Sequence, residues 1–170
     1  ALALATAYMA AVLDDPAEVQ RIRTIAERAL ALAPDDATVL GHVGAALCFV
    51  GSPEEGERHT VRAVRKAPGS GVAHIQHGTA CLMLNRPEEA FSHFSMTERL
   101  RPGAHTMWVV KFRQAQALRE LGRLAPADAA IDESIALNPT FGRAHVEKTL
   151  ICARLGRDAE ARRHIESACK

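Results

Sequence analysis

Proline recurs along this chain at an almost constant interval, and that regularity is the strongest constraint on its fold. The prolines that follow apolar segments are separated by 34, 34 and 37 residues: Pro34, Pro68, Pro102 and Pro139. A second series, of turn-forming residues, is separated by 34, 37 and 34 residues: Gly51, Asn85, Gly122 and Gly156. Both series place three extra residues between Pro102 and Gly122. A period of this length predicts a solenoid of stacked helical hairpins.

Small residues recur in phase with these turns. One series stands in the first helix of each expected hairpin: Gly44, Gly78, Ala115 and Thr149. A facing series stands in the second helix: Gly56, Ala90, Ala127 and Ala161. One helical turn later comes a mostly larger series: Thr60, Phe94, Ile131 and Ile165. Small residues opposite larger ones at fixed spacing are typical of helices that interdigitate closely.

Composition and helix-start signals agree with an all-α fold. Apolar residues make up 48% of the chain but aromatic residues only 4%, which suits close helix packing better than a β-sandwich. Ser52-Pro53 and Asp15-Pro16 each combine an N-cap residue with a proline at the first helical position. No strand pattern competes. Helices are predicted over residues 3–13, 16–32, 37–50, 53–67, 71–84, 87–100, 106–121, 124–137, 142–155 and 158–169.

The pattern resembles the tetratricopeptide repeat, a 34-residue unit with small residues at positions 8, 20 and 27 and proline at position 32. The resemblance covers essentially the whole chain. It implies an all-α, right-handed superhelix of about five antiparallel helical hairpins in one domain, residues 1–170, with units at about 1–36, 37–70, 71–104, 105–141 and 142–170. Because such repeats mostly act as binding scaffolds, it also implies a protein-interaction module and no enzyme.

The chain departs from the repeat at positions 4 and 7, where large apolar residues are usual. Polar residues hold both positions in the last three units: His74 and His77, Lys111 and Gln114, His145 and Lys148. Two interpretations stay open. Either these hairpins pack less tightly inside, or the register of the fourth unit differs and Trp108 occupies position 4.

Two segments are similar to a narrower group of proteins. Residues 26–36 and 99–102, with the lengthened first helix of the fourth unit, are similar to the C-terminal repeat regions of bacterial class III nucleotidyl cyclases and of winged-helix transcriptional regulators. These 170 residues include no catalytic or DNA-binding part of such proteins. The similarity implies the docking or sensory part of a bacterial signalling or regulatory protein.

In this repeat family the first helices line a concave groove, mainly through positions 2, 5, 9 and 12. That spacing places the side chains on one helical stripe. Carried over to the last three units, the candidate partner-binding residues are Val72, Ile75, Thr79, Leu82, Val109, Phe112, Gln116, Arg119, Arg143 and Val146. An apolar middle with a basic end suits an amphipathic helix or an extended segment that bears an acidic group. The alternative is that these side chains only pack against neighbouring helices.

One ligand of the family is excluded by the residues themselves. Receptors for the C-terminal carboxylate of heat-shock chaperones use Lys and Asn at groove positions. Gly41, Ala45 and Gln76 stand at the corresponding positions here. A chaperone-tail receptor is therefore not predicted.

Several other functional classes find no support. The formal net charge is +1 without a long basic run, so nucleic acid is not a predicted partner. The uncharged stretch Ala1–Leu13 is too short to span a bilayer and lacks a positive leading region, so no membrane helix or signal peptide is predicted. No glycine-rich phosphate loop or nucleophile elbow appears, so we predict no catalytic residue and no cofactor. Four cysteines without a CxxC pair predict reduced thiols and a cytoplasmic protein.

The eight histidines raise a metal hypothesis. His74 and His77 lie three residues apart and could present two ligands on one helix face, with His42 or Cys81 as a third. Because no HExxH-type acid accompanies them, we favour packed or surface histidines and predict no metal site. One position of the second helices holds histidine three times, which indicates a recurring surface environment: His59, His93 and His164.

Two further functions are alternatives. The first is homo-oligomerisation through an end of the solenoid, since terminal units need polar outer faces. Ala1–Leu13 carries no charge, and Ile165, Ala168 and Cys169 have no following helix to cover them. The second is a small-molecule sensor that holds an apolar ligand beside Phe112.

Overall fold

The computed structural model describes residues 15–103 and 105–168. Its helices are α2 (Pro16–Leu32), α3 (Ala37–Phe49), α4 (Pro53–Lys66), α5 (Gly71–Met83), α6 (Pro87–Leu100), α7 (Met107–Glu120), α8 (Leu124–Leu137), α9 (Gly142–Arg154) and α10 (Asp158–Ala168). Each agrees with its predicted range to within one residue at either end, and the described residues contain no strand. None of these helices has the length and apolar character that a bilayer-crossing segment needs. The predicted helix 3–13 lies outside the described residues.

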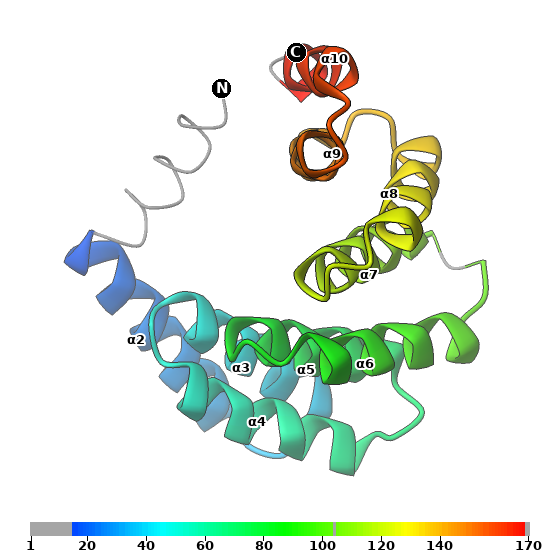
Figure 1. The fold of residues 1–170 in the computed structure, drawn as a ribbon. Coiled ribbons are helices and arrows are strands. Elements are labelled where there is room, and N and C mark those ends of the chain that lie inside the picture. Colours follow the sequence, from blue (N-terminus) through cyan, green and yellow to red (C-terminus); the bar gives the residue numbers. More distant parts are fainter. Residues whose placement is uncertain (1–14, 104, 169–170) are drawn as a thin grey trace.

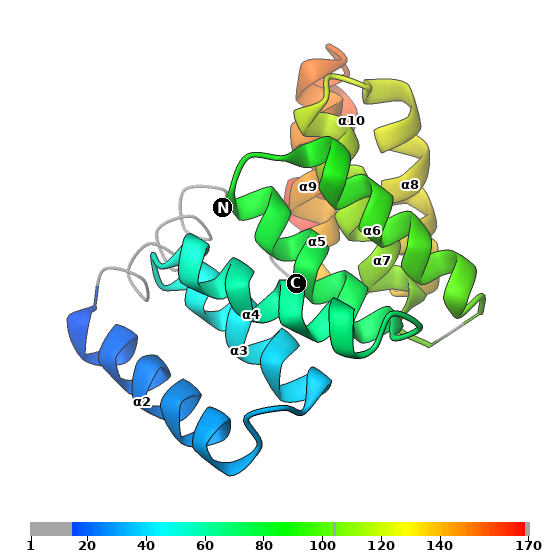
Figure 2. The ribbon, with the colours of Figure 1, turned by 90° about the horizontal axis from the view of Figure 1, so that it is seen from below.

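The helices form a curved stack of antiparallel hairpins (Figures 1 and 2). The hairpins are α3–α4, α5–α6, α7–α8 and α9–α10, and α2 packs against α3 ahead of them. The first helices also contact one another from hairpin to hairpin, α3 with α5, α5 with α7 and α7 with α9. Helices α7 and α9 lie on the inner side of the curve, whereas α8 lies on its outer side (Figure 1). The predicted helical solenoid is thus confirmed.

The small residues let the two helices of a hairpin cross at backbone contact. Gly44 and Gly56 face each other between α3 and α4, and a Cβ on Gly44 would lie 2.5 Å from the carbonyl oxygen of Gly56. In the next hairpin a Cβ on Gly78 would lie 2.6 Å from the ring of Phe94. Other members of these series are buried as well: Ala90, Ala115, Ala127, Ile131 and Ala161. The predicted interdigitation of small and large residues is therefore confirmed.

The three extra residues lie before α7, and this settles the register of the fourth unit. The Ser134 hydroxyl donates to the carbonyl oxygen of Trp108 (2.8 Å), as the Thr97 hydroxyl donates to that of Gly71 (3.2 Å) one hairpin earlier. Gly71 is the first residue of the third unit, so Trp108 is the first residue of the fourth. The interpretation that placed Trp108 at position 4 is wrong.

The polar residues at positions 4 and 7 of the fourth unit form ion pairs and hydrogen bonds with neighbouring helices. These polar contacts, and not a looser packing, replace the usual apolar contacts at the two positions. The ammonium of Lys111 lies 2.8 Å from a carboxylate oxygen of both Glu98 and Glu133. The buried amide of Gln114 donates to the other oxygen of Glu98 (2.9 Å). Burial opposes the charge on Lys111, but the hydrogen bonds to the two carboxylates raise its pKa above the usual value.

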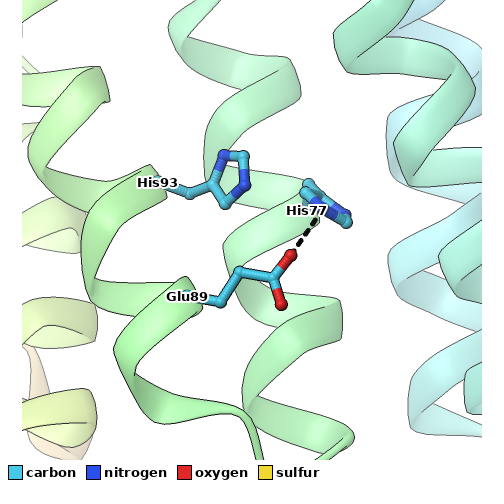
Figure 3. Close-up of side chains that lie close together, drawn as sticks. All are labelled: His77, Glu89 and His93. Carbon is cyan, nitrogen blue, oxygen red and sulfur yellow. Dashed lines mark ion pairs between the residues drawn. The ribbon is translucent and has the colours of Figure 1, made fainter.

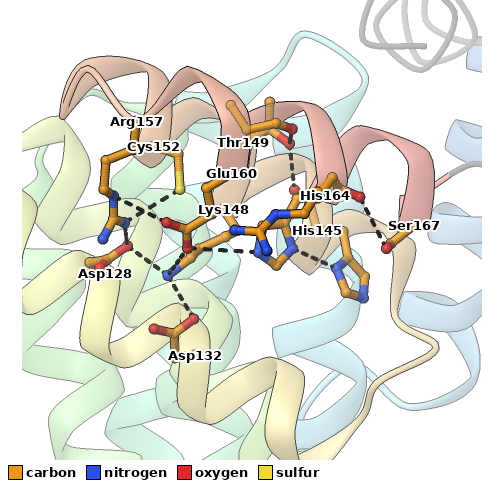
Figure 4. A network of polar contacts seen from close by, with 12 residues as sticks. Asp128, Asp132, His145, Lys148, Thr149, Cys152, Arg157, Glu160, His164 and Ser167 are labelled. Atoms are coloured by element: carbon orange, nitrogen blue, oxygen red, sulfur yellow. Dashed lines mark hydrogen bonds and ion pairs between the residues drawn. The ribbon is translucent and has the colours of Figure 1, made fainter.

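Position 7 of the fifth unit holds a buried lysine. Lys148 is 2% exposed, and its ammonium lies 2.8 Å from Asp128 Oδ1, 2.7 Å from Asp132 Oδ1 and 3.6 Å from Glu160 Oε1 (Figure 4). Arg157 contacts the same oxygen of Asp128 (2.5 Å). Burial opposes the charge on Lys148, but its hydrogen bonds to the two aspartates raise its pKa. The charge is therefore kept inside the solenoid by its partners.

The histidines at positions 4 and 7 are buried, and they contact histidines of the second helices. Nδ1 of His74 lies 2.8 Å from Nδ1 of His93, and Nδ1 of His145 lies 3.1 Å from Nδ1 of His164. Burial lowers the pKa of His77, and burial together with His77 and His74 lowers that of His93 to about 4. The surface environment expected for His59, His93 and His164 is corrected, because all three are half-buried, and His93 and His164 lie against another ring.

The cysteines behave as small packing residues. Cys48, Cys81 and Cys152 are buried free thiols, as predicted, and Cys169 lies outside the described residues. Burial raises the pKa of Cys48 to about 11 and that of Cys81 to about 12. At neutral pH these two groups are therefore thiols and not thiolates.

Candidate functional site

The predicted partner-binding residues lie on α5, α7 and α9, but they do not form one continuous open surface. Most of them are half-buried: Val72, Ile75, Leu82, Val109, Gln116, Arg119 and Val146. Val72 and Ile75 line a space of about 20 Å³ between α5 and α7. That space is large enough for one water molecule but too small for a side chain of a partner. At this point of the groove the alternative interpretation, packing against neighbouring helices, describes the residues better.

Two of the predicted residues do not reach an open surface, which corrects the expected apolar floor. Thr79 is buried, and its hydroxyl donates to the carbonyl oxygen of Ile75 (2.9 Å). Phe112 is only 2% exposed, because its ring meets the ring of Phe141 edge-on with the centroids 5.1 Å apart. The guanidinium groups of Arg113 and Arg143 each lie 5.5 Å from the centroid of the Phe112 ring. A partner on this surface would touch the arginines before it touched the phenylalanine.

A hollow of about 350 Å³ opens beside these arginines, where α5, α7 and α9 come together. Its lining consists of Leu82, Met83, Asn85, Arg113, Gln116, Arg119, Glu120 and Arg143. Four of these are predicted groove residues, Leu82, Gln116, Arg119 and Arg143, so the structure does bring the basic end of the groove together. We call this hollow the arginine pocket.

The three arginines of the pocket differ in what neutralises them. Arg119 lies 2.8 Å from Glu120 and 2.5 Å from Glu147, so its charge is balanced within the chain. Arg113 instead donates to the amide oxygen of Gln116 (2.9 Å). Within residues 15–103 and 105–168, neither Arg113 nor Arg143 has a carboxylate at ion-pair distance. Burial and the neighbouring Arg143 lower the pKa of Arg113 to about 10.

Arg113 was missed by the sequence prediction. It stands at position 6 of the fourth unit, next to the stripe of positions 2, 5, 9 and 12, so the helical spacing alone left it out. The signal available in the sequence was the pair Phe112-Arg113, since an arginine beside an aromatic residue often stacks on its ring. Here that stacking places the charge at the pocket.

The guanidinium groups of the pocket are suited to binding an anionic group. Guanidinium groups bind carboxylates through paired, charge-assisted hydrogen bonds, and the half-buried setting strengthens such bonds relative to those in water. Leu82 and Met83 add an apolar edge at the side of the pocket that α5 forms. The lining offers guanidinium, amide, carboxylate and apolar groups, which together suit a side chain or chain end of a protein partner.

Neither a known protein-family profile nor a curated protein sequence matches this chain. Solved structures are similar to it. Cut9, in the crystal structure of the APC/C hetero-tetramer Cut9–Hcn1, matches over 95% of this chain and 30% of its own, with a TM-score of 0.78 and 19% identity. PilF of Pseudomonas aeruginosa matches over 96% of this chain and 74% of its own, with a TM-score of 0.73 and 14% identity. MamA matches over 90% and 88%, with a TM-score of 0.67 and 19% identity. At these identities the likeness establishes the fold alone.

Proposed function

We propose that this chain, which has the fold of tetratricopeptide-repeat proteins, is a protein-interaction module that holds a segment of a partner protein in the arginine pocket. The segment carries an acidic group, which lies against Arg113 and Arg143, and an apolar residue, which lies against Leu82 and Met83. The proposal assigns no reaction to the chain.

Two guanidinium groups that have no carboxylate at ion-pair distance among the described residues carry this proposal. They face one aromatic ring from α7 and α9, and their mutual repulsion raises the electrostatic cost of the empty pocket. The negative charge of a partner's acidic group, placed beside both, would offset their mutual repulsion on binding. The neighbouring Arg119 does not need such a partner, because Glu147 already neutralises it.

The cellular setting is a separate proposal. We infer that the module is the docking or sensory part of a cytoplasmic bacterial signalling or regulatory protein. Its support is the similarity of residues 26–36 and 99–102 to repeat regions of nucleotidyl cyclases and winged-helix regulators.

Selection of short random peptides displayed on phage against the full chain tests the pocket and requires no identified partner. We expect the selected peptides to share an Asp or Glu beside an apolar residue. For the best peptide, the double variant Arg113→Gln/Arg143→Gln should weaken binding by about 2 kcal/mol, or roughly thirtyfold in Kd, because two charge-assisted hydrogen bonds are lost. Fluorescence anisotropy of the labelled peptide measures this Kd.

The matched control removes two exposed arginines of second helices, as Arg65→Gln/Arg162→Gln. It changes the net charge by the same amount and should leave the Kd within about twofold at physiological salt, where distant surface charges are screened. Selected peptides without acidic residues, or equal losses in the two double variants, would contradict the pocket as the binding site.

Self-association through an end of the stack is the second candidate. On α2, Leu32 is 86% exposed and Ile25 is 57% exposed, and Ile25 lines an apolar hollow of about 270 Å³ between α2 and α3. Exposed apolar surface of this kind tends to be buried by association. Sedimentation over a range of concentrations should show a dimer that Ile25→Lys returns to monomer, and a monomer at every concentration would contradict this candidate. At the opposite end, α10 offers less exposed apolar surface for association, since Ile165 is half-buried.

The small-molecule alternative loses its main support in the structure. It placed an apolar ligand beside Phe112, whose ring is covered by Phe141 and by two guanidinium groups. The adjoining pocket is mostly polar in its side chains.

A further inference from the structure

A cluster of metal-ligand side chains lies between α5 and α6, away from the arginine pocket. His77 comes from α5, and Glu89 and His93 come from α6 (Figure 3). One potential ligand atom from each residue lies within 4.8 Å of the others. Nε2 of His77 lies 3.8 Å from Oε1 of Glu89. We call these three residues the histidine–glutamate cluster.

A chain of hydrogen bonds determines which nitrogen of His93 is free. The carbonyl oxygen of Pro68 only accepts, so Nε2 of His74, at 2.9 Å, must carry the hydrogen that it donates. In a neutral ring Nδ1 of His74 is then an acceptor, and Nδ1 of His93, at 2.8 Å, must donate to it. His93 is left with a lone pair on Nε2. Such a relay to a backbone carbonyl is how proteins orient the histidines that bind metals.

The same reasoning applies to His77 on the other side of the cluster. The Thr60 hydroxyl donates its single hydrogen to the carbonyl oxygen of Glu57 (3.0 Å). It can therefore only accept from Nδ1 of His77, which lies 3.0 Å away. The lone pair of His77 is thus on Nε2, the atom that faces Glu89 and that also lies 3.8 Å from Sγ of Cys81. The free lone pairs of His77 and His93 therefore lie close to the carboxylate of Glu89. None of these three groups donates a hydrogen bond to another.

A second copy of this arrangement lies 71 residues further along the chain, mostly in the fifth unit. The shared residues are Pro68, His74, Cys81, Arg86, Glu89 and His93 in the first copy and Pro139, His145, Cys152, Arg157, Glu160 and His164 in the second. The relay is shared as well, since Nε2 of His145 lies 2.9 Å from the carbonyl oxygen of Pro139 and its Nδ1 lies 3.1 Å from Nδ1 of His164.

The two copies differ at the residue that faces the glutamate. Where the first copy has His77, the second has Lys148, whose ammonium lies 3.6 Å from Oε1 of Glu160 (Figure 4). The second copy thus contains its own cation, held by three carboxylates. The first copy has the same framework, but it has His77 in place of the lysine. A neutral imidazole carries no positive charge and can instead bind a metal cation.

We propose that His77, Glu89 and His93 bind a divalent transition-metal ion, with zinc the best match. Two histidine nitrogens and one carboxylate oxygen form a familiar three-ligand zinc set that leaves a fourth position for water. Arg86 contacts Oε2 of Glu89 at 3.2 Å, which orients the carboxylate and leaves Oε1 for the ion. The side chain of Glu89 is 43% exposed, so the ion can enter from solvent and the carboxylate can move inward to close the site.

Metal binding to the full chain, free of any affinity tag and treated with a chelator, tests the proposal. We expect isothermal titration calorimetry to show one Zn²⁺ per chain with a Kd in the micromolar range or below. Co²⁺ should give the visible absorption of a tetrahedral site without the thiolate-to-metal band that cysteine ligands produce. Glu89→Gln should weaken Zn²⁺ binding by at least tenfold, and His77→Lys, which installs the residue of the second copy, should abolish it.

The matched control is His164→Gln, which removes the equivalent histidine of the second copy and should leave Zn²⁺ binding unchanged. Circular dichroism establishes that each variant is folded, and the exposed position of Glu89 makes Glu89→Gln decisive if His77→Lys does not fold. The proposal is overturned by the absence of stoichiometric binding, by a thiolate band, by unchanged affinity in Glu89→Gln, or by an equal loss in His164→Gln.

Discussion

Gly56→Ala is expected to lower the free energy of unfolding by about 3 kcal/mol, although alanine is the better helix former. The added Cβ would lie 2.5 Å from Sγ of Cys48 and 2.9 Å from its backbone nitrogen, and it would overlap the carbonyl oxygen of Gly44. Two of these three atoms belong to the backbone of α3, so no side-chain rotation relieves the clash. The helices α3 and α4 would have to separate, which loosens the whole hairpin.

Urea unfolding followed by circular dichroism measures this loss. The matched control is Gly41→Ala in the middle of α3, whose Cβ would lie 3.4 Å from Cγ of Gln76, at ordinary contact distance. It should leave stability unchanged or raise it by up to about 1 kcal/mol through helix propensity. If both alanines raised stability alike, the close crossing of α3 and α4 would be refuted.

Lys148→Met is expected to cost about 3 kcal/mol of folding stability, the second largest effect. Methionine fills a similar volume, so the loss comes from the charge and not from a cavity. Without the ammonium, Asp128 and Asp132 repel each other, and Asp128 is only 18% exposed. Removal of one partner from a buried pair typically costs about 3–5 kcal/mol. We expect the lower end, because Asp132 can turn to solvent.

The contrast with an exposed pair makes this prediction specific. The ammonium of Lys66 lies 2.8 Å from Asp35, the same distance as that of Lys148 from Asp128, but both residues of this pair are in contact with solvent. Lys66→Met should therefore leave the urea midpoint almost unchanged. Similar shifts for the two variants would show that burial of Lys148 contributes nothing.

The hairpins could be predicted from the sequence because their closest contacts depend on the size of single residues. Gly44 and Gly56 leave room for a backbone crossing, and in the next hairpin Gly78 leaves room for the ring of Phe94. This requirement for a small residue can be recognised in the sequence, because small residues recur there at a fixed period. The turns add to it, since Gly51, Gly122 and Gly156 have positive φ angles that favour glycine.

The binding surface could be predicted only in part, because exposure depends on neighbours from other hairpins. Phe112 stands on the groove stripe of α7, yet Phe141 and Arg143, from the next hairpin, cover it. No periodicity within α7 contains that information. The lack of a carboxylate at ion-pair distance from Arg113, within the part of the chain that the structure describes, likewise becomes visible only when α7 and α9 are placed together.

The histidine pairs had a signal in the sequence that single positions did not show. Position 4 of the first helix and position 23 of the unit both hold histidine in the third and fifth units. A comparison of these two positions as a pair would have predicted His74 beside His93 and His145 beside His164. Considered one at a time, the same residues suggested only a surface environment.

The 71-residue shift between the two histidine-containing arrangements gives the solenoid a second, longer period. It is too long for one repeat and equals one 34-residue unit and one 37-residue unit together, so the matching segments are blocks of two hairpins. The first block is α3–α6 and the second is α7–α10, and the three extra residues before α7 fall at the seam between them. Glu57 of the first block corresponds to Asp128 of the second, which extends the match into the interior of each block. Helices α3 to α10 therefore contain two blocks of two hairpins with the same polar framework, and His77 in the first block and Lys148 in the second distinguish them.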